Sequence, residues 1–546
     1  MRSYRSFSAV VFVVVVCALI GGLFGRGALE AQDQLPEQYK VFAAALRAVE
    51  ENYVGEAPSD RLVYGAITGM LQTLDPHSSF MDAKSYATMR ERQEGRYYGL
   101  GISISVVDAD ITVAAVFEGS PAYQKGVRRG DVIAKIEGDD TKGWGSDKAV
   151  QRLRGQKGTP VAISVRRSGY DKLIDLQVIR DEIHMPTVPA SFMMDSTTGY
   201  LRLTDFGENT DQELGRALKD LTGKGMKRLV FDLRGNPGGA LDQAIKVSNR
   251  FLPQGDMIVF TKGRVQNSAQ DYRAAERSEY LNLPMITLVN RSSASASEIV
   301  SGALQDHDRS LIVGETTFGK ALVQSVFRVS GNAGAAITTA RYYTPSGRLI
   351  QRPWDGTFDE YLTYTMREQD ANKAHRTEDL KYTDSGRKVY SGGGVEPDRR
   401  LDGPVMGFNP TRFARTIYAR NLFGSFSERF RRRGDTRITA TATQAVRELA
   451  PDFAVDEKMV EEFRKHVEGQ KPALTFDEEA WKKDQNFIRA MIRFEIDLDL
   501  FGVEAAWQNL VKLDPQVQFG VGFFPEAQTL LDISKQSNTS RRSAQK

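Results

Sequence analysis

The sequence predicts a multidomain α/β protein in which a β-rich module lies between a helical N-terminal region and an α/β domain. Short β segments crowd between residues 97 and 182, and strands then alternate with helices to about residue 350. The 546 residues, 41% hydrophobic and 26% charged, suffice for several folded domains. In chain order we expect a signal peptide or membrane anchor (1–30), an N-terminal helical region (35–96), the β-rich module (97–182), the α/β domain (183–402), a C-terminal helical region (403–535) and a disordered tail (536–546).

The N-terminal segment reads FSAVVFVVVVCALIGGLFG over residues 7–25 and follows Arg2 and Arg5. Its roughly 19 apolar residues can span a bilayer as one helix. Because the small-residue cleavage site is poor, we expect an uncleaved anchor in preference to a cleaved signal peptide. Either one exports the rest of the chain, with both arginines left in the cytoplasm. The only cysteine, Cys17, lies here, which excludes disulfides within the mature chain and Cys-based zinc sites.

The first two folded regions differ in their periodicity. Helical spacing of apolar residues marks 35–96, as in YKVFAAALRAVEENYV and RLVYGAITGMLQTL. In the β-rich module, a short helix is expected at SPAYQKG and a longer one at DKAVQRLRG. Its five expected strands are GLGISISVV, ITVAAVF, DVIAKIEG, TPVAISVRR and LIDLQVIRD.

The α/β domain should place helices over a sheet, because strand and helix patterns alternate in it. A polar excursion at about 353–390 precedes GGGVEPD, and the region 403–535 is mainly helical in pattern. The Ser/Arg/Gln-rich tail should be disordered. The alternating segments are TGYLRLTDF, DQELGRALKDLTG, RLVFDLRG, ALDQAIKVSNRFL, MIVFT, MITLVN, SEIVSGALQD and SLIVGE.

Several function classes are disfavoured by composition and by missing motifs. A net charge of +3 creates no field that would attract nucleic acid. The five histidines form no H-E-x-x-H pattern, and no G-x-S-x-G segment occurs. We therefore expect no nucleic-acid partner, no metal and no cofactor.

Four serines crowd at the head of a predicted helix in NRSSASASEIVSGALQDHDR, residues 290–309. Either they cap the helix, or one of them is a nucleophile. His307 follows Ser295 by 12 residues on the same predicted helix, or about 18 Å, so it cannot be the base. Lys320 is a candidate, because burial among small and apolar residues disfavours the ammonium and a neutral amine can accept a serine proton. An ordinary loop lysine is the alternative.

At these residues the chain resembles the carboxyl-terminal processing proteases, also called tail-specific proteases. Their serine lies in a Ser-Ala-Ser-Ala-Ser-Glu segment, followed by a lysine 25 residues later and a glutamine four beyond; Ser295, Lys320 and Gln324 have this spacing. The resemblance covers about residues 40–400. It implies a crotonase-like α/β serine protease core with an inserted PDZ domain, in which Ser295 is the nucleophile and Lys320 the base. The supporting blocks are GMLQTLDPHSSF, GLGI, FDLRGNPGG, TTARYYTPSGRLIQ and GGGVEPD.

The position of Ser295 suits a nucleophile. It falls where MITLVN passes into a helix, so unpaired N–H groups and the positive end of the helix dipole face it. The Ala296 N–H can then donate to an oxyanion, and a second donor should come from Gly238 or Gly239, which permit close backbone approach. The structural alternative is that Ser295 and Glu298 form an S-x-x-E capping box. The resemblance favours the nucleophile.

The role of Gln324 depends on local conformation. A helical turn over 320–324 would bring Gln324 to the Lys320 amine. An extended chain, which KALVQSVF resembles more closely, would separate their Cα atoms by about 13 Å. The resemblance implies contact, and we predict that Gln324 orients Lys320.

The β-rich module resembles a PDZ domain whose carboxylate-binding loop is Gly99, Leu100, Gly101 and Ile102. Successive backbone N–H groups there can hold a terminal carboxylate, while the next strand pairs with an extended peptide. Arg154 matches a position implicated in coupling PDZ docking to the active site in some relatives. A solvated surface arginine is the alternative.

Together these features predict a serine endopeptidase that processes or degrades exported proteins after its PDZ domain captures their free, extended, apolar C-termini. We expect it on the periplasmic side of the bacterial inner membrane, anchored through its N-terminal segment or released. A second copy of the chain or an adaptor protein is a further candidate partner. A non-catalytic PDZ scaffold or chaperone-like adaptor is the competing class, and intact Ser295 and Lys320 count against it. An acyl-CoA enzyme of the crotonase-like fold explains neither the PDZ module nor the dyad.

Overall fold

The computed structural model describes residues 37–167, 170–354, 360–361, 375–401, 410–432, 447–470 and 474–544. The chain divides into two compact units, Met1–Ala83 with Val326–Ile337, and Lys84–Ser325 with Thr338–Lys546. The predicted anchor at 7–25 lies outside the described residues. Within the described ranges, no helix is both long and apolar enough to cross a bilayer.

The described part of the first unit includes the helices α2 and α3 and a small strand pairing. Helices α2 (Glu37–Asn52) and α3 (Ser59–Gln72) match the two predicted helical patterns and precede β1 (Ser79–Met81). Strand β1 pairs antiparallel with the beginning of β18 (Gly334–Tyr343). The ring of Phe80 packs 4.9 Å from that of Tyr64. The next helix, α4 (Ala83–Glu94), lies almost wholly in the second unit, so the predicted region 35–96 is divided between the units.

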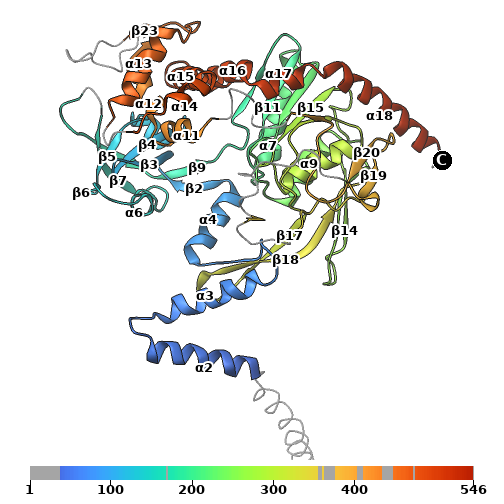
Figure 1. Cartoon of the computed structure of the whole chain (residues 1–546), viewed down its shortest axis with the longest axis horizontal. Coiled ribbons are helices and arrows are strands. Elements are labelled where there is room, and N and C mark those ends of the chain that lie inside the picture. The colour runs from blue at the N-terminus through green and yellow to red at the C-terminus, as the bar shows by residue number, and fades with distance from the viewer. Residues whose placement is uncertain are drawn as a thin grey trace, which may run out of the picture. The chain divides into compact units, whose positions relative to one another are not determined.

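The β-rich module contains all five predicted strands and both predicted helices (Figure 1). Its main sheet has the order β3-β4-β5-β7-β8, with β6 paired to β5, while β2 pairs with β9. Alternate side chains of β7 point into the core, as the period of two in a half-buried strand requires. The elements are β2 (Arg96–Gly99), β3 (Ile102–Val107), β4 (Asp110–Val116), α5 (Pro121–Gln124), β5 (Val132–Ile136), β6 (Asp139–Asp140), α6 (Ser146–Leu153), β7 (Pro160–Arg166), β8 (Ile174–Ile179) and β9 (Asp181–His184).

The α/β domain is built on a six-stranded sheet of order β10-β11-β12-β15-β16-β21, parallel from β11 onward. Strands β15 and β16 are buried along their whole length, which explains their uninterrupted apolar sequences. One face of the sheet packs against helices α7, α8 and α9. The elements are β10 (Ala190–Met193), β11 (Thr198–Arg202), α7 (Thr210–Gly223), β12 (Arg228–Asp232), α8 (Leu241–Asn249), β15 (Met285–Val289), α9 (Ala296–Asp306), β16 (Leu311–Gly314) and β21 (Arg399–Arg400).

The other face of this sheet is covered by the end of the chain. Helices α16 (Val503–Leu513), α17 (Pro515–Val521) and α18 (Phe524–Ala544) follow one another along it (Figure 1). Val517 and Phe524 belong to the same buried cluster as Ile286 and Leu288 of β15. The last three helices therefore complete the α/β domain.

The prediction of a disordered tail is wrong for residues 536–544, because helix α18 continues to Ala544. The sequence between Lys535 and Ala544 contains no glycine or proline that would end a helix. Polar composition alone was therefore insufficient to predict disorder at these residues.

Before α16, the C-terminal region forms a separate helical bundle. Its core stacks aromatic rings, for example Phe423 on Phe463 at 4.7 Å between ring centroids. Arg129 of the β-rich module pairs with Glu495 of this bundle and donates to Asn421 Oδ1 at 3.2 Å. The elements are α11 (Arg412–Ala419), α12 (Leu422–Ser427), β22 (Phe430–Arg432), β23 (Arg447–Leu449), α13 (Glu457–Glu468), α14 (Glu478–Lys483) and α15 (Gln485–Leu500).

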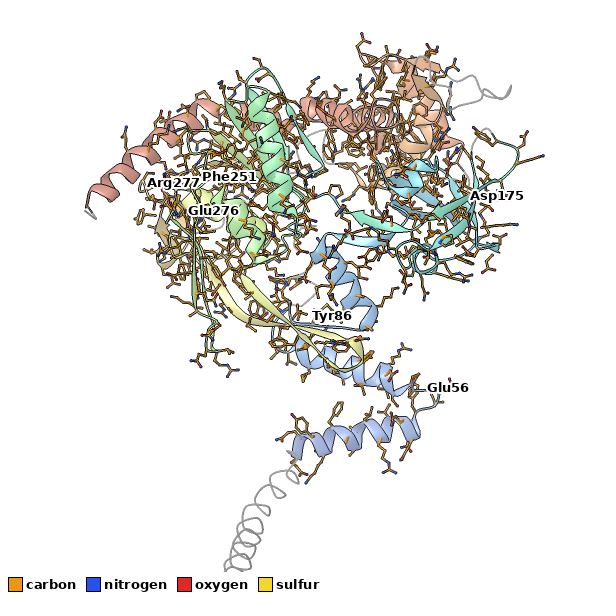
Figure 2. All side chains as sticks on the ribbon, turned by 180° about the vertical axis from the view of Figure 1, so that it is seen from behind. Glu56, Tyr86, Asp175, Phe251, Glu276 and Arg277 are labelled. Atoms are coloured by element: carbon orange, nitrogen blue, oxygen red, sulfur yellow. The ribbon has the colours of Figure 1, made fainter. Side chains whose placement is uncertain are left out.

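The remaining strands lie beside the main sheet of the α/β domain. Strand β13 pairs with both β14 and the end of β18, and β17 pairs with β18. In Figure 2 the side chain of Phe251 lies inside the α/β domain, where its ring is 5.6 Å from that of Phe231, whereas exposed Asp175 marks strand β8. The strands are β13 (Met257–Lys262), β14 (Gln270–Arg273), β17 (Leu322–Arg328), β19 (Leu380–Tyr382) and β20 (Lys388–Tyr390).

Candidate active site

Ser295 occupies a strained turn between a strand and a helix. Strand β15 ends at Val289, helix α9 begins at Ala296, and Ser295 between them has φ 54° and ψ −111°. A positive φ is rare outside glycine, and such a conformation costs about 1–3 kcal/mol unless its surroundings enforce it. Strained strand-to-helix turns of this kind present the nucleophile in other hydrolases. The backbone thus distinguishes Ser295 within its segment.

Its serine neighbours serve the structure instead. The hydroxyl of Ser293 donates to the carbonyl of Leu233 at 2.9 Å, and that of Ser297 donates to the carbonyl of Asn236 at 2.9 Å. Both side chains are fully buried, whereas Ser295 is half-buried. A substrate can therefore reach Ser295 more readily than either neighbour.

The carboxylate of Glu298 joins the backbone of Ser295 to that of Lys320. One oxygen accepts from the Ser295 N–H at 2.8 Å and from the Lys320 N–H at 2.9 Å. The other accepts from the Gly319 N–H at 2.6 Å and the Thr317 hydroxyl at 2.5 Å. Burial raises the pKa of Glu298 to about 7. The hydrogen bonds from these donors favour the carboxylate and oppose this rise. The capping-box partner predicted for Ser295 thus also holds the lysine segment.

Tyr342 forms a second link between the same two segments. Its hydroxyl lies 3.1 Å from the Ser295 carbonyl oxygen and 2.5 Å from the Lys320 carbonyl oxygen. Burial raises the pKa of Tyr342 well above its usual value, so the hydroxyl remains a donor. The Phe318 N–H also donates to the Ser293 carbonyl at 2.9 Å. The structure therefore brings together the segments that carry Ser295 and Lys320.

The glycine turn between β12 and α8 lies against the serine. Gly238 has φ 97°, and a Cβ at this position would lie 2.8 Å from both the Ala296 nitrogen and the Ser295 Cβ. Only glycine allows so close an approach. The Gly238 N–H donates to Asn236 Oδ1 at 2.9 Å. The N–H groups of Gly239 and Ala296 have no acceptor in the described part of the chain.

Lys320 and Gln324 lie on an extended stretch. The half-buried Lys320 stands between the buried Gly319 and Ala321, and Gln324 belongs to strand β17. The helical-turn geometry for 320–324 is therefore wrong, and the strand indicated by KALVQSVF is present. The Gln324 amide donates to Thr338 Oγ1 at 3.3 Å. Its orienting role toward Lys320 stays a prediction.

The histidine nearest in sequence to the serine segment has structural partners. His307 ends helix α9, with Nδ1 2.8 Å from Asp384 Oδ2 and Nε2 2.6 Å from the Met257 carbonyl oxygen. Both ring nitrogens are thereby engaged. His307 is consequently unsuited to act as a base.

The loop predicted to bind a carboxylate joins β2 to β3 in the β-rich module. The carbonyl of Leu100 accepts from the Ala122 N–H at 2.9 Å, and that of Gly101 accepts from the Phe117 N–H at 2.9 Å. Gly101 has φ 79°, and Ile102 begins β3 directly after it. The N–H groups of Leu100 and Gly101 donate to no residue that the structure describes. Unengaged successive N–H groups can hold an anion.

Arg154 lies beside this loop and is engaged by its neighbours. Its guanidinium pairs with Glu91 of α4 and lies 4.5 Å from the centre of the Tyr97 ring. Its Cγ would lie 3.6 Å from a Cβ at Gly99. Arg154 therefore lies beside the loop with its guanidinium paired, and its coupling role stays a prediction.

Sequence reasoning missed part of this site. The sequence predicts only a capping role for Glu298, and Tyr342 is only one residue of the block TTARYYTPSGRLIQ. The S-x-x-E pattern was a signal for Glu298, but its contact with Lys320 requires the chain to return 22 residues later. Nothing in the local sequence indicates that return.

Comparisons with known proteins agree with the fold. Residues 197–358 match peptidase family S41, residues 88–166 match the PDZ domain, and residues 26–85 match the N-terminal domain of the activating protease CtpB. The carboxy-terminal-processing protease of Bartonella bacilliformis is 42% identical over 319 residues, covering 58% of this chain and 73% of that protein. The carboxy-terminal processing protease CtpA of Bacillus subtilis is 33% identical over 350 residues, covering 63% and 74%.

Among solved structures, the photosystem II D1 C-terminal processing protease is 26% identical, covering 68% of this chain and 95% of that one, with a TM-score of 0.35. Fold, site and relatives together define a serine-type peptidase with a PDZ domain. The chain belongs to the carboxy-terminal processing proteases of peptidase family S41. The predicted family, fold class and enzyme class are confirmed.

Proposed function

We propose that this peptidase is an endopeptidase with a Ser295–Lys320 dyad that processes or degrades exported proteins from their C-terminal tails after PDZ capture. The observation that carries the proposal is the positive φ of Ser295, at a turn whose backbone is tied through Glu298 to the backbone of Lys320. Nucleophilic catalysis without histidine needs another base near the serine, and the segment that carries Lys320 is held beside the one that carries Ser295.

In the first step the Ser295 hydroxyl attacks the scissile carbonyl carbon while the neutral amine of Lys320 takes its proton. Collapse of the tetrahedral intermediate breaks the C–N bond, and Lys320 returns the proton to the leaving amine. Water then attacks the acyl-enzyme and loses a proton to Lys320; as the ester C–O bond breaks, Lys320 returns that proton to the Ser295 oxygen and both residues are restored. Glu298 and Tyr342 hold the two segments in register during both steps.

The oxyanion is stabilised by the Ala296 N–H and by one donor of the glycine turn. Gly238 is the glycine packed on Ser295, but its N–H already donates to Asn236 Oδ1. The Gly239 N–H lacks an acceptor among the described residues. Gly239 can thus serve without breaking a hydrogen bond, whereas Gly238 would have to exchange its partner.

The PDZ domain binds the free tail of a substrate. The N–H groups of Leu100 and Gly101 hold the terminal carboxylate, flanked by Gly99 and Ile102, while the preceding residues pair with strand β3. Arg154 couples the bound tail to the active site, since its side chain passes Gly99 of the loop and its guanidinium pairs with Glu91 of α4. The substrates are periplasmic proteins, and the segment 7–25 anchors the enzyme to the bacterial inner membrane or is removed on export.

The decisive experiment is degradation of an unfolded protein by the wild type and by Ser295→Ala, with the products identified by mass spectrometry. We expect the wild type to generate new C-termini and Ser295→Ala to generate none. A matched substrate with a blocked tail should be cleaved more slowly. Wild-type cleavage by Ser295→Ala would contradict the dyad, and binding of tails without cleavage by the wild type would identify a scaffold.

A further inference from the structure

The segment around Asp514 reaches the active-site turn through one buried arginine. Arg234 lies four residues before Gly238, and its Nε and Nη2 donate to Asp232 at 2.9 and 2.6 Å. From the other side, Nη1 donates to Asp514 Oδ1 at 3.1 Å and to Gln516 Oε1 at 2.8 Å. Nη2 also lies 2.8 Å from Asp514 Oδ2. The guanidinium is thus held between the sheet and the last helices of the chain.

Arg234 belongs to a buried cluster of charged residues whose charges balance only when Asp514 is included. Asp232 is fully buried, pairs with Arg202 at 2.9 Å, and accepts from the Tyr200 hydroxyl at 2.6 Å. Two carboxylates, Asp232 and Asp514, therefore face two guanidiniums, Arg202 and Arg234. Removing one partner of a buried charge pair is costly because it leaves the other uncompensated. Without the carboxylate of Asp514, one buried positive charge is left over.

The same cluster fixes the backbone where the glycine turn begins. Arg202 Nη2 donates to the Arg234 carbonyl at 3.1 Å, and the Arg234 N–H donates to Asp232 Oδ1 at 2.9 Å. The Gly235 N–H donates to Asn290 Oδ1 at 2.9 Å. Three residues later Gly238 packs on Ser295. A shift of Arg234 is therefore transmitted through a very short stretch of chain.

Asp514 itself is held firmly. It is the N-cap of α17, and its Oδ1 accepts from the N–H groups of Gln516 at 2.9 Å and Val517 at 3.3 Å. Val517 is fully buried in the cluster that covers the sheet. A carboxylate at a helix N-terminus is also favoured by the helix dipole. The packing of α17 on the sheet thus sets the position of the carboxylate.

We propose that Asp514 is a positioning residue of the active site: through Arg234 it places the glycine turn against Ser295. The proposal rests on the proposed function, because it assumes that this turn supplies an oxyanion donor. On this proposal the N-terminus of α17 contributes to turnover, in addition to the packing of α17 on the sheet. Substrate capture by the PDZ domain does not depend on it.

The test compares kcat and KM of Asp514→Asn with those of the wild type on a peptide with a free C-terminus. Asparagine keeps the helix cap and removes the charge. We expect kcat to fall about tenfold with KM changed less than twofold. Loss of a whole oxyanion donor costs about 10² to 10³ in kcat, and here a donor is displaced, not removed. Asp514→Glu should recover part of the loss by restoring the carboxylate.

Asp456→Asn is the matched control, because Asp456 caps α13 by accepting from the Met459 N–H at 2.8 Å. It should retain wild-type kcat. Should Asp514→Asn fail to fold, Gln516→Met removes a neutral acceptor from the same guanidinium nitrogen and should lower kcat two- to threefold.

Folded variants with wild-type kcat would overturn the inference, as would an equal loss in Asp456→Asn. The outcome is read beside Ser295→Ala. If Ser295→Ala is inactive while Asp514→Asn is fully active, only the positioning role fails. If Ser295→Ala is active, the dyad itself fails.

Discussion

Two serines in the described part of the chain invite comparison as nucleophiles: Ser425 of the C-terminal bundle and Ser295 of the protease domain. In the C-terminal bundle, Ser425 of α12 lies 2.8 Å from His466 Nε2 of α13, which resembles a nucleophile and its base. In the protease domain, Ser295 has no histidine partner in its segment, and its backbone is tied to that of Lys320. Two features distinguish the serines: the hydrogen positions in the Ser425–His466 pair and the backbone conformation at each serine.

In the Ser425–His466 pair, the positions of the hydrogen atoms prevent the histidine from acting as a base. Arg429 Nη2 lies 2.9 Å from His466 Nδ1, and a guanidinium can only donate. Nδ1 must therefore accept, so that Nε2 carries the hydrogen and donates to the Ser425 hydroxyl. The Ser425 hydroxyl lies 3.2 Å from the Leu422 carbonyl, which can accept its proton. His466 thus cannot take a proton from Ser425.

The backbone differs as well. Ser425 lies inside helix α12, where its N–H donates to the Asn421 carbonyl at 2.9 Å, whereas Ser295 precedes the first turn of α9 at a positive φ. Unpaired N–H groups at a helix start can stabilise an oxyanion, but those inside a helix cannot. A short serine–histidine contact is consequently weaker evidence for a nucleophile than a strained turn at a helix start.

The largest predicted effect tests this comparison directly. Ser295→Ala and Lys320→Ala should each reduce proteolysis by about 10⁴-fold or more, because both groups act in the same step. Their double variant should be no worse than either single variant. Ser425→Ala and His466→Ala should retain wild-type kcat. Initial rates on an unfolded protein substrate measure all five, and an inactive Ser425→Ala would reverse the assignment of the two pairs.

The next effect concerns the carboxylate that joins the serine and lysine segments. In Glu298→Gln an amide NH₂ replaces one of the two oxygens, so two of the four donors now face another donor. Because misplacement by about 1 Å can cost about 10²-fold, we expect kcat to fall 10- to 100-fold. Steady-state kinetics on a short peptide measures the loss.

Glu495→Gln is the matched control for that change. Glu495 is also a buried carboxylate, but it lies in the C-terminal bundle and pairs with Arg129. We expect less than a threefold change in its kcat. An equal loss in both variants would mean that burial of a carboxylate, and not the link between Ser295 and Lys320, determines the rate.

Most secondary structure of the two central domains could be predicted from the sequence, for a physical reason. Strands buried on both faces, such as β15 and β16, read as unbroken apolar runs, and amphipathic helices keep their period. The proposed nucleophile follows from the SASASE spacing and the resemblance, since capping and catalysis use the same residues at a helix start. The strained φ of Ser295 was not visible in that pattern.

What could not be predicted involves contacts between distant segments. The apolar period of 503–530 indicates helices but not the surface that they cover, which is one face of the protease sheet. Asp514 and Arg234 lie 280 residues apart, and each taken alone is an ordinary charged residue. For Gln324 the local pattern indicated a strand, which is present, and the helical turn suggested by the implied contact with Lys320 is wrong; its orienting role stays a prediction.

An effect of similar size is expected at the PDZ loop, but it acts through binding. Amidating a substrate's C-terminus removes the anion that the N–H groups of Leu100 and Gly101 should hold. Charge-assisted hydrogen bonds contribute roughly 1.5–3 kcal/mol, so docking should weaken about 10- to 100-fold. If docking only tethers the substrate, KM rises alone; if it also activates the protease, kcat falls with it. Equal cleavage of amidated and free tails at subsaturating concentration would contradict carboxylate capture.

The smallest effect returns to the pair that is not an active site and concerns stability alone. Burial, and next the charge of Arg429, lower the pKa of His466 from 6.5 to about 4, because the folded bundle disfavours the imidazolium. The unfolded chain therefore binds a proton between about pH 6.5 and 4 that the folded chain excludes. The contribution of His466 to the free energy of unfolding is fully present above pH 6.5 and is lost as pH falls through 4.

At about 1.4 kcal/mol per pKa unit, the upper limit of this contribution is about 3 kcal/mol, and partial solvent exposure reduces it. His466→Gln keeps a neutral group that can accept from Arg429 and donate to Ser425, so its unfolding free energy should vary less with pH over this range. Urea unfolding of both proteins at pH 5 and pH 7.5 measures the difference. If the wild type loses no more stability than His466→Gln on going to pH 5, the folded chain does not keep the imidazole neutral. The argument that Nε2 must donate to Ser425 would then fail.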